Sequence, residues 1–323
     1  NSSGYFFGAA MTLILRELRA STEPGALHTA TTATTTKPHK AGKATRLTKP
    51  DTTVKATDPE RVHPGGVPRI LNVVPSTGTE TDWSADDALE AGLLTAVRRP
   101  DAVDLRQDWW TVGDQGSTGS CVGWATADGV GRYLMVTGGR LASDQRLSPR
   151  FIWMSSKETD EFDSRPTSFV EGSGTSLKSA MDVARKFGFA LETDLPFAIA
   201  TTMYLGQENA FYAAAAQRRV SYVNLDRDLE KWKDWLHQNG PILAGLSVDE
   251  NWMRLGARGK LDAYAGSHIY GGHAVCIVGY RKDGTFVVRN SWGTGWGAHG
   301  FAYVTPAYLE AAFYPESYGA KLS

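Results

Sequence analysis

The hydrophobic pattern of this chain changes its period near residue 240, and that change limits the folds open to it. Before it, hydrophobic residues recur at helical spacing, and after it they alternate as in strands. The pattern predicts helices near residues 120–134, from residue 148, and over residues 176–187 and 228–238, and strands over residues 242–248, 273–280, 285–289 and 300–304. Helices followed by antiparallel strands indicate a two-lobed α+β domain, which we place at residues 103–323.

The N-terminal part contains a long segment that is unable to form a core. Residues 26–66 hold no aromatic residue, and their larger aliphatic residues are Leu27, Leu47, Val54 and Val62. Such a segment buries too little apolar surface to offset the ordering of its backbone, so we interpret it as a flexible linker rich in Thr, Lys and Pro. Residues 1–25 precede it as a separate segment. We interpret residues 1–10 as a processed end or a cloning remnant.

Order is predicted to return over residues 67–102. This region begins with an apolar run, and further on Ser84 precedes a short acidic segment that is typical of a helix start. Because its apolar residues need a partner, we expect the region to pack on the main domain. It would be a pro-segment that occupies or flanks the cleft in cis, a strap, or an N-terminal ornament.

Composition excludes several classes of protein. The chain has 323 residues, 41% of them hydrophobic, which rules out a wholly disordered chain. Its 34 basic and 35 acidic side chains give a formal charge of −1, so no global field favours nucleic acid or an anionic membrane. Its longest apolar run, residues 5–15, is shorter than the roughly 18 residues of a membrane span.

The cysteine count limits the chemistry further. Two cysteines exclude a disulfide framework and any zinc site built on cysteine pairs. We therefore expect no metal and no cofactor. The compartment stays open between a cytoplasmic and an exported soluble protein.

One of the two cysteines stands at a predicted helix start. Cys121 follows a glycine-rich approach that begins with Gln115. The positive end of a helix and its free N–H groups would stabilise a thiolate, which is the nucleophilic form of the side chain. The alternative for a cysteine considered alone is a small buried thiol, which is the more common case.

A histidine begins an apolar predicted strand. Alternation places His273 on one face of this strand with Val275 and Ile277, and Ala274 and Cys276 on the other. If His273 faces a cleft, Cys276 faces the core, so we interpret Cys276 as a packing residue.

A third motif begins at Asn290. Its carboxamide can accept the ring proton of a histidine on the neighbouring strand and so fix which ring nitrogen faces a thiol, while Trp292 keeps water away. Gly295, Gly297 and Gly300 match the spacing of a dinucleotide-binding loop. The residues that follow predict a strand instead of the required helix, so we reject nucleotide binding.

Together, these motifs resemble those of the papain-like cysteine peptidases, in the variant associated with bacterial members. Cys121, His273 and Asn290 stand in the family's order, and Gln115 lies six residues before the cysteine, as the family's oxyanion glutamine does. Further matches are Val103–Arg106, similar to a mature N-terminus, residues 172–177, similar to the strip that pairs with substrate backbone, and residues 195–197.

The resemblance implies a fold and a mechanism. It implies a helical N-terminal lobe, an antiparallel β-barrel-like C-terminal lobe and a cleft between them. Cys121 would be the nucleophile and His273 the base, oriented by Asn290. Gln115 would stabilise the oxyanion of a peptide or protein substrate.

The resemblance also assigns substrate-binding positions, and the chain departs from the family pattern at others. Gly172, Gly174, Gly272 and Trp292 would line the substrate site. Thr118 stands where many relatives have a disulfide cysteine, and Val122 replaces the usual tryptophan. Gly272 replaces the Asp or Asn that often precedes the histidine.

Three functions remain compatible with this sequence. The leading hypothesis is a cysteine endopeptidase that is autoinhibited by its N-terminal region. A second is acyl transfer or peptide ligation by the same Cys–His pair, because a thioester can react with nucleophiles other than water. A third is a non-catalytic peptide-binding module on a peptidase fold.

Overall fold

The computed structural model of this chain describes residues 66–92, 94–95, 98–159, 171–198 and 208–323. Residues 1–25 and nearly all of the predicted linker lie outside the described residues. All the described residues belong to one structural unit. No helix among them is long and apolar enough to cross a membrane.

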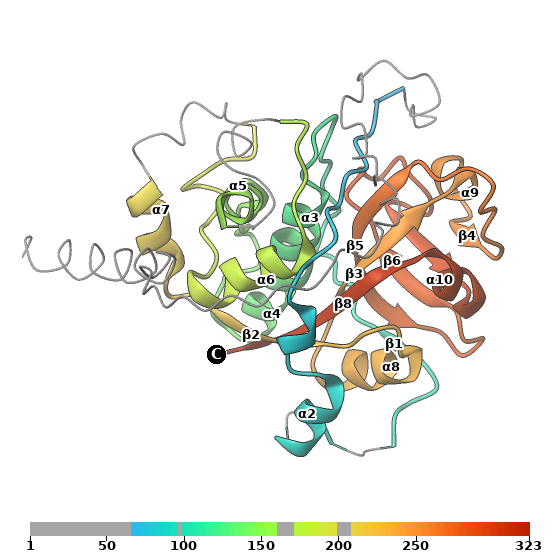
Figure 1. The fold of residues 1–323 in the computed structure, drawn as a ribbon, viewed down its shortest axis with the longest axis horizontal. Helices are drawn as coiled ribbons and strands as arrows, with labels where there is room; N and C mark the ends of the chain where they lie inside the picture. The colour runs from blue at the N-terminus through green and yellow to red at the C-terminus, as the bar shows by residue number, and fades with distance from the viewer. Residues whose placement is uncertain (1–65, 93, 96–97, 160–170, 199–207) are drawn as a thin grey trace, which may run out of the picture. The chain divides into compact units, whose positions relative to one another are not determined.

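The first half of the domain is mainly helical, as the sequence predicts (Figure 1). Its helical segments are η2 (Thr79–Thr81), α2 (Ala85–Glu90), α3 (Cys121–Gly123), η3 (Trp124–Gly131), α4 (Arg132–Thr137), α5 (Pro149–Thr159), α6 (Leu177–Lys186) and α7 (Glu208–Ala215). The second half adds α8 (Leu229–Gln238), α9 (Glu250–Met253) and α10 (Pro306–Ala312). The helix predicted near residues 120–134 continues to residue 137, and its middle part, η3, is a π-helix.

Side-chain caps fix several helix starts where the sequence predicts them. The hydroxyl of Ser84 accepts a hydrogen bond from the Asp87 N–H, and the Asp87 carboxylate accepts one in return from the Ser84 N–H. Ser176 caps α6 by accepting from the Ser179 N–H, and Asp228 caps α8 by accepting from the N–H groups of Glu230 and Lys231. Gly188, at φ 95°, follows the end of α6 in the left-handed conformation that favours glycine.

The second half builds most of one sheet. Its order is β2 (Val220–Asn224), β8 (Phe313–Leu322), β3 (Ile242–Val248), β5 (Gly271–Tyr280), β6 (Phe286–Arg289), β7 (Phe301–Val304) and β4 (Lys260–Leu261), and β1 (Val103–Asp104) pairs with β5. The pairing corrects the antiparallel barrel-like expectation in two respects. The β4–β7 pair is parallel, and among the described residues no pairing joins β2 to β4, so the sheet is mixed and open.

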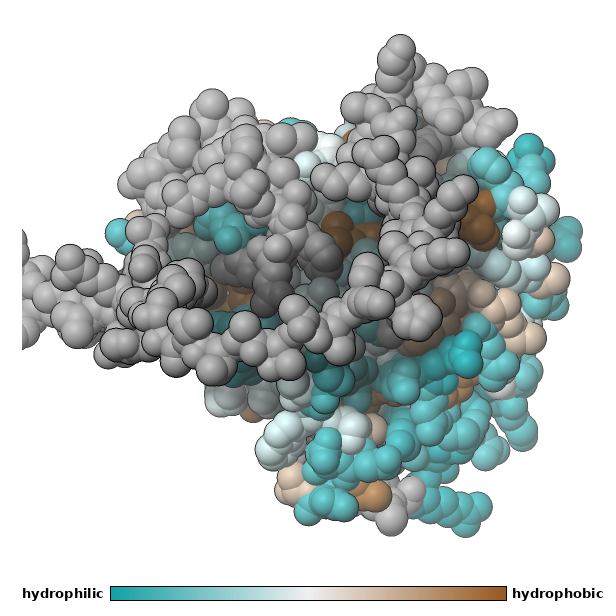
Figure 2. Space-filling model, in the orientation of Figure 1, coloured by the Kyte–Doolittle hydropathy of each residue, from teal (hydrophilic) through white to brown (hydrophobic). Residues whose placement is uncertain are grey.

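Each face of the central strand β5 contributes to a different hydrophobic cluster. Ala274 and Cys276 pack in the cluster of the helical lobe, whereas Val275 and Ile277 pack in the cluster that contains α8. Cys276 is buried and its side chain contacts Gly129 of η3, so it is a packing residue, as predicted. Figure 2 shows a mostly hydrophilic surface around α8, with hydrophobic side chains in small patches.

The N-terminal residues pass between the lobes before the chain enters the domain (Figure 1, blue to cyan). The Val73 N–H donates to the Gly272 carbonyl at 3.2 Å, on the sheet side. The Val74 N–H donates to the Thr175 carbonyl at 3.1 Å, on the helical side. We name residues 69–76 the blocking segment, because they contact residues of both lobes.

Candidate active site

The first residue of α3 is the cysteine singled out in the sequence. Cys121 lies where the N-terminal end of this helix meets strand β5, and the backbone N–H groups of Ala274 and Val122 interact with its thiol. Both N–H groups and the helix terminus favour a thiolate. Ala274 directly follows His273, so the fold brings the first two motifs to one place.

The histidine and the asparagine are joined by a hydrogen bond. Strands β5 and β6 pair antiparallel with Arg289 opposite Cys276, which brings Asn290 alongside His273. His273 Nε2 lies 2.7 Å from Asn290 Oδ1, so the amide oxygen accepts the Nε2 proton. His273 Nδ1 has no hydrogen-bond partner among the described residues and retains its lone pair. Trp292 lies against the ring, with centroids 5.0 Å apart.

The glutamine belongs to the same network through a serine. Ser291 Oγ donates to Gln115 Oε1 at 2.8 Å, and the Gln115 N–H donates to the Ser291 carbonyl at 2.8 Å. The Ser291 N–H donates to Asn290 Oδ1, also at 2.8 Å. One residue therefore fixes both carboxamides. Ser291 was missed as a site residue, although it lies between Asn290 and Trp292 in the third sequence motif.

Burial keeps both ionisable groups of the site neutral. Burial raises the pKa of the Cys121 thiol to about 11, more than the neighbouring backbone N–H groups lower it. Burial also lowers the pKa of His273 to about 4, against the opposite effect of its hydrogen bond to Asn290, and the charge of Arg69 lowers it further. In this structure, in which both side chains are buried, Cys121 is a thiol and His273 is a neutral imidazole.

The blocking segment lies along the cleft that the family resemblance implies, and Cys121 is fully buried. Asn72 Nδ2 donates to the Gly172 carbonyl, and Gly174 lies so close that a Cβ there would be 2.0 Å from the Asn72 oxygen. On the sheet side the approach is looser, because a Cβ at Gly272 would lie 3.2 Å from the Val73 Cβ. Gly172, Gly174 and Gly272 thus all contact the blocking segment.

An arginine secures the start of the blocking segment. Arg69 forms an ion pair with Asp114, donates to the Gly116 carbonyl at 3.1 Å, and lies over the ring of Trp292 at 5.4 Å. The Arg69 side chain is only 2% exposed, so the cation is buried between the loop near Gln115 and the loop near Trp292. Among the described residues, no three or more His, Cys, Asp or Glu side chains are grouped to hold a metal ion.

The sequence profile described as papain family cysteine protease matches residues 99–310. This chain belongs to the papain family. It is 28% identical over 230 residues to a cysteine protease of Blomia tropicalis, which covers 69% of this chain and 66% of that protein. It is 30% identical over 216 residues to the probable cysteine protease RD21C of Arabidopsis thaliana, covering 62% of this chain and 42% of that protein. The chain thus spans less than two thirds of the length of these relatives.

Solved structures of papain-family proteins share the fold. Xylellain, a cysteine protease from Xylella fastidiosa, superposes with a TM-score of 0.67 at 21% identity, covering 79% of this chain and 97% of that one. The digestive procathepsin L 3 of Tenebrio molitor gives a TM-score of 0.57 at 19% identity, covering 78% and 77%. The papain-like α+β fold predicted from the sequence is therefore confirmed.

The buried histidine of this papain-family chain predicts a pH-dependent stability. An unfolded histidine titrates near pH 6.5, whereas His273 titrates near pH 4 in the closed state. Between these values the unfolded chain binds more protons, so the free energy of unfolding falls on acidification, by at most about 3 kcal/mol. Urea unfolding at pH 7 and pH 4 should show that the free energy of unfolding depends less on pH in His273→Gln than in the parent chain. An unchanged pH dependence would contradict the prediction, and exposed His237→Gln is the matched control.

Proposed function

We propose that this chain is a cysteine peptidase that hydrolyses peptide bonds through a thioester, and that its N-terminal region blocks the cleft of the intact chain. The supporting observation is the hydrogen-bonded chain from His273 through Asn290 and Ser291 to Gln115, beside the helix that begins at Cys121. Such a set orients a base, a nucleophile and an oxyanion donor around one point.

In the proposed mechanism, the thiol, the imidazole and the two carboxamides of the candidate site each have one role. Cys121 gives its proton to His273 Nδ1, while the Nε2 proton stays on the hydrogen bond to Asn290. The thiolate attacks the peptide carbonyl, and the oxyanion accepts hydrogen bonds from the Cys121 N–H and from Gln115 Nε2. His273 then protonates the leaving amine and later activates the water that hydrolyses the thioester.

Gln115 offers a test of the oxyanion role. We expect Gln115→Ala to lower kcat by about 10²-fold to 10³-fold with a small change in KM, because a lost oxyanion donor weakens only the transition state. Initial rates on a fluorogenic peptide, measured on unblocked enzyme, would show this split. Gln238→Ala, on the outer helix α8, is the control. A rise in KM at constant kcat would assign Gln115 to substrate binding instead.

Reversing the charge of Arg69 tests the block. We expect Arg69→Glu to raise peptide turnover by the full chain at least about tenfold, because a carboxylate would then face Asp114 and no cation would lie over Trp292. The matched control is Arg254→Glu, since Arg254 is exposed and pairs with Glu250. Equal turnover by Arg69→Glu and the parent chain would contradict the blocking role.

An epoxide inhibitor and product masses test the reaction itself. The Arg69→Glu chain should gain one epoxide adduct at Cys121 under reducing conditions, and peptides should be cleaved with the addition of one water. Condensation with an added amine in excess of hydrolysis would favour acyl transfer. Binding of peptide with neither adduct nor turnover would favour a non-catalytic module.

A further inference from the structure

The N-terminal region makes two sets of contacts, which meet at Lys178 of α6. The blocking segment, residues 69–76, contacts the candidate active site and the rim of the cleft, and its last residue, Ser76, bonds to Glu316 of β8 and accepts a hydrogen bond from the Lys178 N–H. The described residues of 82–102, which we name the brace, contact α6, strands β2 and β8, helix α8 and the far end of strand β5. Between them lies a short turn, Thr77–Thr81.

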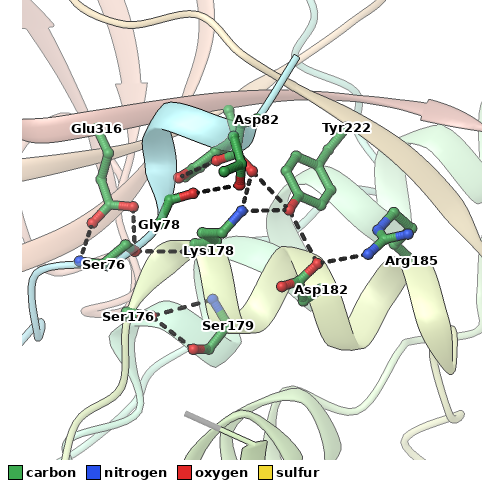
Figure 3. A network of polar contacts seen from close by, with 12 residues as sticks. Ser76, Gly78, Asp82, Ser176, Lys178, Ser179, Asp182, Arg185, Tyr222 and Glu316 are labelled. Carbon is green, nitrogen blue, oxygen red and sulfur yellow. Dashed lines mark hydrogen bonds and ion pairs between the residues drawn. The ribbon is translucent and has the colours of Figure 1, made fainter. Parts of the chain in front are cut away.

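The brace begins with a buried acid. Asp82 is only 4% exposed at its side chain and pairs with Lys178 of α6, and the hydroxyls of Tyr222 and Tyr318 each donate to it at 3.3 Å (Figure 3). Removing this carboxylate would leave Lys178 without its acidic partner and the buried Tyr318 hydroxyl without this acceptor, which is unfavourable. The start of the brace is therefore fixed to both lobes independently of the cleft.

The rest of the brace completes a hydrophobic cluster. Ala85, Ala88 and Leu94 are buried in the same cluster as Leu229 and Trp232 of α8. Polar contacts extend this attachment: the Asn224 N–H donates to the Trp83 carbonyl at 2.8 Å, Arg99 pairs with Asp234 at 3.0 Å, and the Tyr280 hydroxyl donates to the Pro100 carbonyl at 2.8 Å. Removing the brace would expose one face of α8.

The turn differs from both of its neighbours. Thr77, Glu80 and Thr81 are exposed, and η2 contains no buried residue. Gly78 has a φ of 66°, so the chain reverses here through a left-handed residue. Endopeptidases cleave preferentially at exposed turns, because the backbone there can enter the cleft of the attacking enzyme.

We propose that Thr77–Thr81 is a processing site, and that residues 82–102 remain a permanent part of the folded enzyme. This inference rests on the proposed function. One peptide C–N bond breaks in the turn, and water supplies the hydroxyl of the new carboxylate and a proton to the new amine. The blocking segment then loses its covalent link to the brace and leaves the cleft by dilution. Cleavage before Val103, the mature end implied by the family resemblance, would leave the brace attached and the cleft blocked.

Two full-length variants test the proposal. One carries the recognition sequence of a site-specific endopeptidase between Thr77 and Gly78, and the other carries it between Ala102 and Val103. When the first variant is cut after Thr77, residues 1–77 should separate on size exclusion and turnover at nanomolar enzyme should rise at least about tenfold. The remaining chain should keep a cooperative melting transition. After cleavage after Ala102, both fragments should co-elute and turnover should stay at the uncut level. The parent chain treated with the same endopeptidase is the control.

The two outcomes that overturn the proposal are release of residues 1–102 from a folded remainder, and retention of residues 1–77 after the first cut. Separation as expected with no turnover would refute the proposed peptidase function but would support the processing site and the brace, because size exclusion and melting do not depend on catalysis.

A substitution tests the brace without any insertion. Leu94 is buried, whereas Leu89 on the neighbouring helix α2 is 49% exposed. We expect Leu94→Asp to lower the melting temperature of the full chain by about 10 °C, and the matched Leu89→Asp to leave it nearly unchanged. Equal melting of Leu94→Asp and the parent chain would refute a permanent structural role.

Discussion

Replacing Cys121 with alanine is expected to lower kcat/KM for peptide hydrolysis by at least about 10⁴-fold, because no other nucleophile in the proposed mechanism can form the thioester. The substitution removes one buried sulfur and leaves the hydrogen bond between His273 and Asn290 in place. Turnover should be measured in the Arg69→Glu chain, in which we expect the block to be weakened. A loss of turnover there would report on catalysis and not on access to the cleft.

Cys276→Ala is the matched control. Both thiols are buried, and burial raises the pKa of both, but Cys276 packs against Gly129 and lies on the face of β5 opposite to His273. We expect this control to keep turnover within about threefold of the parent and to lose some stability through the small cavity it creates. Residual turnover by Cys121→Ala close to that of Cys276→Ala would refute the assignment of the nucleophile.

The residues of the candidate site stand out in the sequence because each of them lies in a local motif. Cys121 is at a helix start, His273 is near a strand start, and Asn290 directly follows the next strand, so the sheet register aligns the last two. The burial of Cys121 was not predicted. Val73 lies in the same hydrophobic cluster as Cys121, and its N–H donates to the Gly272 carbonyl, so the contacts here join segments far apart in the sequence.

Strand β8 shows why part of the sheet was missed. Its alternation is interrupted by Glu316, a carboxylic acid that is buried to 1% exposure. Burial raises the pKa of Glu316, while hydrogen bonds from the Ser76 N–H and hydroxyl act in the opposite direction. Glu316 is buried because its hydrogen-bond partner comes from the N-terminal region, and the alternation of polar and apolar residues along the strand cannot reveal such a partner. The parallel pair β4–β7 was missed because β4 has only two residues.

Asp128 is another buried acid that sequence periodicity did not reveal, and it carries the second large prediction. It lies in η3, in the helix that begins at Cys121, and accepts hydrogen bonds from Arg146 at 2.7 Å and from Arg289 at 2.6 Å. Arg132 lies 3.5 Å away. Burial would raise the pKa of the Asp128 carboxyl, but the charges of Arg289 and Arg146 outweigh it and hold this pKa below its usual value.

We expect Asp128→Asn to lower the free energy of unfolding by about 3–5 kcal/mol, because Arg132 and Arg289 would stay buried without a counter-charge. Asp262→Asn, which removes an exposed partner of Lys260, should change it by less than about 0.5 kcal/mol. Urea unfolding at pH 7 would measure both, since the Asp128 contribution is complete above about pH 4 and is lost as the pH falls through its lowered pKa. Because Arg289 directly precedes Asn290, the same variant should also lower kcat in the folded fraction. Stability within about 1 kcal/mol of the parent would mean that the arginines find other acceptors, and that the lobes do not depend on this ion pair.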